Sequence, residues 1–202
     1  MIVSNAVVIR RIVVSLLSRF RSQPPGKYPN GDAFKHAVMD AYGFTDAAKR
    51  ILADTRFTVR NLHAPDGGGF WYGPEENRIE LFGIQAEAAI HEMAHAWADL
   101  TGFYDEYSKE WDRWPTLNRT FRADVRRAAD EKDPQYPRIS FIAGEYEFGN
   151  PQTGFPGMFE NDSERFAGLA SGAMADPQKM PPYIRRWYVQ LFGGTIQPLA
   201  GS

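Results

Sequence analysis

The chain has 202 residues, 43% of them hydrophobic, which is enough for one substantial core, so we expect a single domain over residues 1–202. A formal net charge of −2 gives no electrostatic reason to expect nucleic acid as a partner. The absence of cysteine excludes disulfides, zinc sites with cysteine ligands and thiol nucleophiles.

The N-terminal segment, residues 1–25, is apolar but broken by arginine. Arg10 and Arg11 split its apolar run, whereas a signal peptide needs an uninterrupted one. No run reaches the roughly 20 residues of a membrane span, so we expect a cytoplasmic protein. We interpret the segment as an amphipathic helix or strand packed on the domain. The alternatives are a basic anchor at a membrane surface and a removable pro-segment.

The next part of the chain changes from a helical to an alternating pattern. Helices are expected over residues 32–42 and 46–54. Residues 57–62 and 78–82 alternate between apolar and polar side chains, which predicts two short strands, and a turn signal occupies residues 73–77. We therefore expect a small mixed or antiparallel sheet beside the helix that follows.

The C-terminal half is predicted to be mainly helical. Loops are expected over residues 133–137 and 148–157, and the second, which is rich in Gly and Pro, could border a cleft. Further helices are expected over residues 106–112, 116–130, 163–175 and 183–192. The fold class that results is α+β, mostly helical with a small sheet.

The most informative stretch is His91-Glu92-Met93-Ala94-His95, an HExxH pentapeptide. Residues four apart lie on one face of a helix, so both imidazoles can meet one metal ion. Glu92 stands beside them, within reach of a water on that metal. By chance the pattern would occur in about one chain in a hundred of this length. The alternative is a surface helix with two solvated histidines.

The surroundings of the pentapeptide favour the metal interpretation. It lies inside a predicted helix, residues 84–101, which has neither Gly nor Pro and ends at Gly102. The buried side of this helix is expected to consist of Ile90, Met93, Ala94, Trp97 and Ala98.

A catalytic zinc usually takes three protein ligands, so one more is needed. No histidine follows His95, and Ala98 and Thr101 stand where the metzincin extension requires Gly and His. The third ligand is therefore a carboxylate or one of the upstream histidines, His36 and His63.

Glu164 is the best carboxylate candidate. It falls in the first turn of the predicted helix 163–175, whose small residues would let it pack closely against the motif helix. Asp162 is the alternative, although it or Ser163 also suits the role of a helix cap. Glu145, Glu147 and Glu160 are weaker, because we expect them in loop or strand.

With Glu164 in a Glu-x-Phe-Ala context, the HExxH motif resembles the gluzincin branch of the zincin metallopeptidases, particularly catalytic domains of the anthrax lethal factor type. The resemblance covers about residues 57–175 in architecture, and only the pentapeptide is specific in sequence. The chain lacks the Asn-Glu-x-x-Ser-Asp pattern of thermolysin-like members. The resemblance implies a zincin-like fold, a peptide or protein substrate, Glu92 as general base, and Zn²⁺ held by His91, His95 and Glu164.

Other residues are expected to assist the site. An oxyanion needs a donor, for which Tyr146 and Tyr104 are candidates; in the resembling family a Tyr often has this role, but none stands close before Glu164. Asp99 or Glu87, one turn from the histidines, could hydrogen-bond a ligand imidazole.

Three hypotheses of function follow from this site. The leading one is a zinc metallopeptidase in which strand 78–82, as an exposed sheet edge, pairs with an extended peptide. The alternatives are a non-catalytic zincin-like binding module and a latent, toxin-like effector protease that is held inactive by its N-terminal segment.

Overall fold

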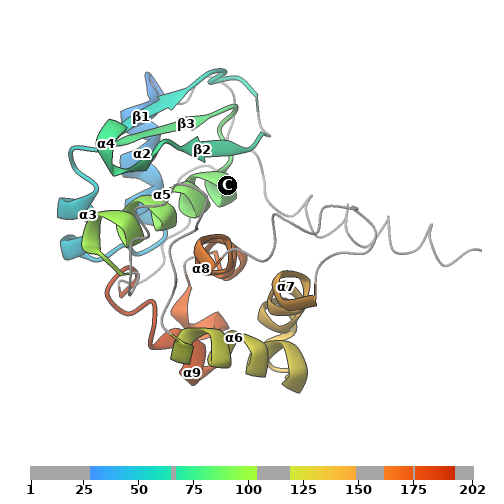
Figure 1. Cartoon of the computed structure of the whole chain (residues 1–202). Helices are drawn as coiled ribbons and strands as arrows, with labels where there is room; N and C mark the ends of the chain where they lie inside the picture. The colour runs from blue at the N-terminus through green and yellow to red at the C-terminus, as the bar shows by residue number, and fades with distance from the viewer. Residues whose placement is uncertain (1–27, 65–66, 104–118, 149–161, 175, 194–202) are drawn as a thin grey trace, which may run out of the picture.

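The computed structural model describes residues 28–64, 67–103, 119–148, 162–174 and 176–193 (Figure 1). The N-terminal segment and the predicted helix 106–112 lie outside these ranges. In chain order the elements are α2 (Gly31–Ala41), α3 (Asp46–Ile51), β1 (Arg56–Val59), β2 (Gly69–Trp71), α4 (Gly73–Glu76), β3 (Arg78–Leu81), α5 (Ala86–Thr101), α6 (Arg119–Glu131), α7 (Pro137–Phe148), α8 (Asp162–Gly172), the 3-10 helix η1 (Pro177–Lys179) and α9 (Pro182–Arg185). The fold class is α+β and mostly helical, as predicted.

The sheet has three strands in the order β1-β3-β2 and is mixed. β1 runs parallel to β3, with Arg56 opposite Arg78, and β2 runs antiparallel, with Gly69 opposite Leu81. β3 is thus the central strand, and the expectation that it forms an exposed edge is wrong. Its free side is taken by β2, a three-residue strand that the sequence pattern did not predict.

The sheet buries one face and exposes the other. Ile79 and Leu81 of β3 are fully buried, whereas Arg78 and Glu80, which alternate with them, form ion pairs on the outer face. There Arg78 Nη1 lies 2.7 Å from Glu80 Oε2, and Arg60 pairs with the same carboxylate. This alternation follows from the two-residue period of a strand and directs the apolar face toward α5 and α2 (Figure 1).

Helix α5 carries the pentapeptide through the centre of the molecule (Figure 1). It ends where predicted, at Gly102, whose φ of 64° is the left-handed conformation that glycine adopts most easily. The Phe103 amide then bonds back to the Ala98 carbonyl at 2.9 Å. All five side chains expected to be buried are at most 2% exposed: Ile90, Met93, Ala94, Trp97 and Ala98.

Helix α8 packs directly against α5, and stacked aromatic rings hold it there (Figure 1). Phe166 lies between Trp97 and Tyr188, with ring centroids 6.0 and 4.7 Å away. The Tyr188 hydroxyl donates a hydrogen bond to the Phe166 carbonyl at 2.8 Å. The small residues predicted to allow close packing, Ala167, Gly168, Ala170 and Ser171, are all buried. The orientation of Glu164 relative to α5 is therefore fixed by the core.

The main correction in the C-terminal half is α7. Residues 137–148 form this helix, although the sequence pattern placed Glu145 and Glu147 in loop or strand. Helix α7 has little segregation of polar and apolar side chains, so its sequence carries a weak helical signal. The predicted helix 183–192 is also shorter: α9 ends at Arg185, and turns lead to Phe192, which bridges to Phe44.

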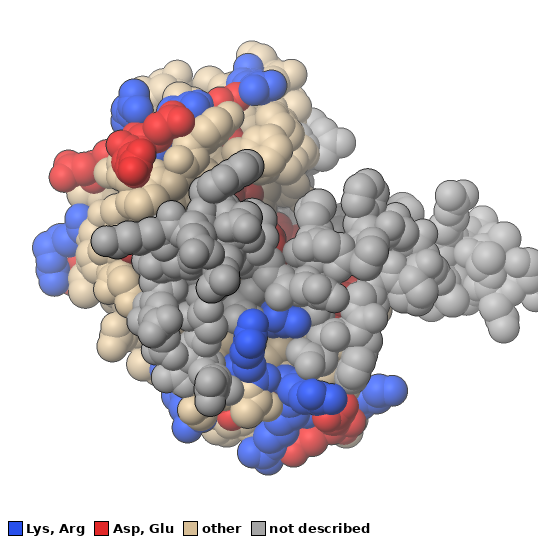
Figure 2. Space-filling model, in the orientation of Figure 1, with Lys and Arg blue, Asp and Glu red and all other residues tan. Residues whose placement is uncertain are grey.

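Basic side chains gather over α6 and α9, at the lower edge of the face in Figure 2. Several of them already have acidic partners. Arg186 Nη2 lies 2.6 Å from Asp124 Oδ2, and Arg127 Nε lies 2.6 Å from Glu131 Oε1. Of the described helices, none is long and apolar enough to cross a membrane.

Candidate metal centre

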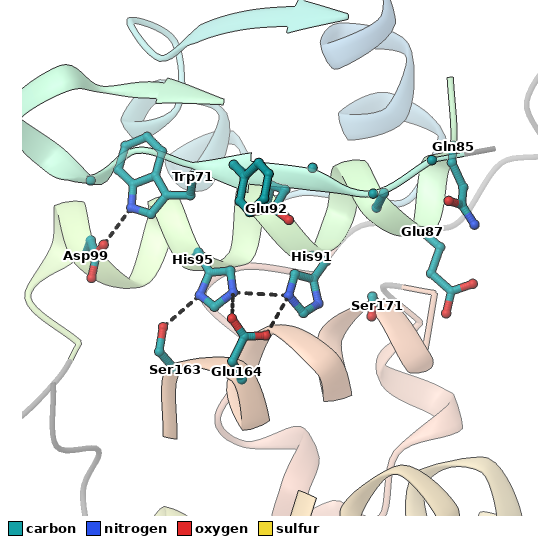
Figure 3. A pocket seen from close by; sticks show the side chains of 16 residues that line it. Trp71, Gln85, Glu87, His91, Glu92, His95, Asp99, Ser163, Glu164 and Ser171 are labelled. Carbon is teal, nitrogen blue, oxygen red and sulfur yellow. Dashed lines mark hydrogen bonds and ion pairs between the residues drawn. The ribbon is translucent and has the colours of Figure 1, made fainter. Parts of the chain in front are cut away.

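Two helices bring three metal-ligating side chains to one point (Figure 3). His91 and His95 come from successive turns of α5, and Glu164 comes from the first turn of α8. His91 Nε2 lies 3.1 Å from Glu164 Oε2, and His95 Nε2 lies 3.3 Å from Glu164 Oε1. The two Nε2 atoms are 3.1 Å apart. All three side chains thus direct their donor atoms at a common centre.

The spacing of these atoms fits a metal ion. Tetrahedral zinc with ligands at about 2.1 Å separates its ligand atoms by about 3.4 Å. The observed separations of 3.1 to 3.3 Å are close to that figure. Two imidazole nitrogens cannot face each other at 3.1 Å with both lone pairs directed inward unless a proton or a cation lies between them. Two nitrogens and a carboxylate are also a donor set that zinc accepts.

Ser163 fixes the ring of one ligand. Its Oγ lies 2.7 Å from His95 Nδ1, on the side of the imidazole that faces away from the centre. When Nδ1–H donates to this hydroxyl, the proton resides on Nδ1 and Nε2 keeps its lone pair for the metal. Ser163 precedes Glu164 on α8, so one turn of that helix supplies both a ligand and an orienting group.

The charges of the three ligands are coupled. Burial lowers the pKa of His91, but the hydrogen bond to Glu164 and the nearby carboxylates outweigh burial, so this pKa is raised overall. For Glu164 the effects have the opposite signs. Burial raises its pKa, but the hydrogen bonds from His91 and His95 outweigh burial and hold the pKa of Glu164 far below its ordinary value. Glu164 is therefore ionised at neutral pH, as a metal ligand must be.

Glu92 lies beside the histidines on the side of β2 (Figure 3). It is only 8% exposed, and burial raises its pKa against the opposing effects of His91 and His95 and of a backbone hydrogen bond from Trp71. Gly69 makes room for it, because a Cβ at that position would lie 2.8 Å from Glu92 Cγ. The edge strand β2 thus holds this carboxylate in place.

A cleft of about 820 Å³ runs past the metal centre. The glycine-rich segment that leads into β2 forms one wall of the cleft. The side chains of His91, Glu92 and His95 on α5 line the cleft beyond this wall (Figure 3). Opposite them stands the start of α8, with Ser163 and Glu164. Among the described residues, the candidate metal centre therefore borders a cleft large enough for a peptide segment, while most of each candidate ligand side chain is buried.

Comparisons of the chain with known protein families, with curated protein sequences and with solved structures found no match. The geometry of the site supports a metal-binding function: two histidines and a glutamate could hold one ion beside a buried carboxylate.

The structure separates the candidate ligands. Glu164 joins the two motif histidines, whereas His63 is exposed in a turn and His36 is exposed on α2. Asp162 begins α8, so the chain is already helical there, and Ser163 is not a cap but a partner of His95. The side chain of Asp162 lies outside the described part of the structure.

The other side chains that were expected to orient a ligand or to stabilise an oxyanion either have different partners or lie outside the described part of the structure. Asp99 Oδ2 accepts a hydrogen bond from the Trp71 indole at 2.6 Å, and Glu87 Oε1 accepts one from Arg138 at 2.9 Å. Neither of these bonds orients an imidazole. Tyr104 lies outside the described residues, and Tyr146 falls on α7 with its side chain outside them. The sequence alone does not identify Ser163 as the orienting group, because its role depends on how α8 docks.

Proposed function

We propose that the chain is a zinc-dependent metallopeptidase that hydrolyses peptide bonds. The observation that carries this proposal is the meeting of His91, His95 and Glu164 beside a buried Glu92 in an open cleft. A purely structural zinc site is closed by four ligands and has no need of an adjacent base. Three candidate ligands within the described part of the chain, a base and a cleft beside them together favour hydrolysis over a non-catalytic binding module.

The chemistry divides between the metal and the chain. A zinc ion on these ligands would lower the pKa of water to about 7 and polarise a carbonyl group. Glu92 accepts a proton from the water that attacks the carbonyl carbon, then passes it to the nitrogen as the C–N bond breaks. Its raised pKa suits both transfers, since a base that must also act as an acid works best near the ambient pH.

The substrate would pair with β2 rather than with β3. In the order β1-β3-β2, the outer edge of β2 has no strand partner among the described residues, and this edge belongs to the cleft wall. An extended peptide added there would align one peptide bond across the metal centre. This placement replaces the edge role first expected of residues 78–82.

The proposal is tested with purified, zinc-loaded full chain and a diverse peptide library, with Glu92→Gln as the control. The variant keeps the size of the side chain and removes the base. We expect cleavage by the unaltered chain and a loss of about 10²- to 10⁴-fold in the variant, with equal zinc content. Unchanged cleavage in the variant, or binding of zinc and peptide without cleavage by the unaltered chain, would contradict the proposal.

A further inference from the structure

One end of the cleft is formed by a carboxylate and an indole ring that the proposed chemistry does not use. Asp99 lies one turn beyond His95 on α5, and Trp71 reaches it from β2 (Figure 3). The indole N–H donates to Asp99 Oδ2 at 2.6 Å, and both residues line the cleft. Asp99 is only partly buried, and the indole contacts one of its two carboxylate oxygens.

Asp99 differs from the other acidic side chains of the cleft in its partners. Glu164 meets the two histidines, and Glu87 forms an ion pair with Arg138 at 2.9 Å. Glu92 is buried beside the histidines and takes the role of the base. Asp99 receives a hydrogen bond only from the neutral indole, within the described part of the chain. Apart from Glu92, Asp99 is the described cleft carboxylate that forms no ion pair.

The described lining of the cleft contains no lysine or arginine. In Figure 2, one group of basic side chains lies over α6 and α9, and others lie at the upper and left edges of this face. A partly buried carboxylate beside an indole ring is a combination that recognises an ammonium or guanidinium group, by charge-assisted hydrogen bonding and by the attraction of a cation to an aromatic face.

We propose that Asp99 and Trp71 form a subsite for a lysine or arginine side chain of the substrate. This inference rests on the proposed peptidase function and specifies its substrate class: peptides with a basic residue at one fixed position relative to the cleaved bond. The hydrogen bond from the Trp71 indole holds the Asp99 carboxylate in place. The negative charge of that carboxylate selects the basic side chain of the substrate.

The test compares peptides that differ only by Lys, Arg, Gln or Glu at each position around the cleaved bond. We expect the unaltered zinc-loaded chain to prefer Lys or Arg over Gln at one position by about tenfold or more in kcat/KM, as for a hydrogen bond between charged groups. Asp99→Asn should reduce that preference by about tenfold, because its amide oxygen still accepts the indole N–H but carries no charge. Asp99→Lys should shift the preference toward Glu.

Asp54→Asn is the matched control, since it removes the same charge from an exposed turn and should keep the preference. A role for Asp99 in positioning β2 alone would leave the Lys-to-Gln ratio intact in Asp99→Asn, and that result would overturn the inference. Indifference of the unaltered chain to basic residues at every position would overturn it as well. Either result leaves the peptidase proposal standing, provided cleavage is still lost in Glu92→Gln; no cleavage at all would remove both.

Discussion

Ser163 Oγ lies 2.7 Å from Nδ1 of His95, while Nε2 of the same ring points at the metal centre. The hydroxyl is buried, so its bond to the imidazole is shielded from water. Through this bond α8 sets the ring orientation and tautomer of a ligand that belongs to α5. The candidate metal centre is therefore built by the docking of two helices.

Replacing Ser163 with Ala should weaken metal binding without removing a ligand. Loss of an orienting partner of this kind typically costs about 10- to 100-fold in metal affinity. Ser171→Ala is the control, because Ser171 is also buried on α8 and lines the cleft, but its hydroxyl bonds to the Gly168 carbonyl. Competition titration with a zinc chelator measures both affinities. Equal affinities in the two variants would show that Ser163 does not orient His95.

The sequence predicted the parts of this site that depend on local spacing. His91 and His95 share a helical face because they are four residues apart, and Gly102 marks the end of that helix. Glu164 followed from the absence of other ligands and from helix signals near residue 162. The shared face of the histidines and the end of their helix are set within a few residues along the chain, whereas the contact of Glu164 with His91, 73 residues away, depends on how α8 docks.

What the sequence did not predict depends on contacts between distant segments. The three residues of β2 are too few to show a pattern, and they become a strand only by pairing with β3. The order β1-β3-β2 is a property of that pairing, so the sequence could not show that β3 is central. The bond between Trp71 and Asp99, 28 residues apart, arises in the same way.

Without metal, the stability of the chain should depend on pH through His91 and Glu164. The raised pKa of His91 stabilises the fold below its unfolded value near 6.5, and this contribution is lost as the pH rises through the raised value. The lowered pKa of Glu164 stabilises the fold above its unfolded value near 4.5, and this contribution is lost as the pH falls toward the lowered one. Both contributions are complete between about pH 4.5 and 6.5.

Thermal unfolding in the presence of a chelator measures this dependence. We expect the midpoint to be higher at pH 6 than at pH 9, and Glu164→Gln to reduce the difference. With zinc present the dependence should reverse, because protonated histidine cannot bind metal and zinc then stabilises the fold more at the higher pH. A metal-free chain with the same pH dependence in Glu164→Gln would show that the His91–Glu164 pair does not cause it.

A buried lysine joins α2 to the end of α3, far from the cleft. Lys35 is 2% exposed, and its Nζ lies 2.8, 3.3 and 3.5 Å from the carbonyl oxygens of Thr55, Ala53 and Leu52. Lys35→Met would keep the apolar length of the side chain but remove the charged donor that the three carbonyls share and leave the Leu52 carbonyl with only the Thr55 amide, which should lower the free energy of unfolding by about 2–3 kcal/mol.

Denaturant unfolding measures the free energy of unfolding of Lys35→Met and of a control variant, Lys49→Met. Lys49 also makes a charged contact, 2.6 Å from Asp40 Oδ1, but that carboxylate is 71% exposed. Its loss should change the free energy of unfolding by less than about 1 kcal/mol. Similar values for the two variants would mean that the buried carbonyls are satisfied in another way once Lys35 is removed.

Two neighbouring glycines of the cleft wall should respond differently to a methyl group. Neither Gly68 nor Gly69 has a positive φ, so only space decides the outcome. A Cβ on Gly69 would overlap the Leu81 side chain and lie 2.8 Å from Glu92 Cγ, whereas one on Gly68 would meet only Phe82 Cδ2, at 4.0 Å. Gly69→Ala must therefore displace Glu92 or move β2 away from α5.

We expect Gly69→Ala to lower the free energy of unfolding by about 1–3 kcal/mol, as overpacking of a core does. We also expect peptide cleavage to fall by about tenfold or more, because a shift of Glu92 would misplace the catalytic base. Gly68→Ala should change stability by less than about 0.5 kcal/mol. Measuring cleavage, zinc content and unfolding for both variants separates a displaced base from a lost metal. If Gly69→Ala cleaved peptides at the rate of Gly68→Ala with zinc bound in both, contact with β2 would not be what positions Glu92.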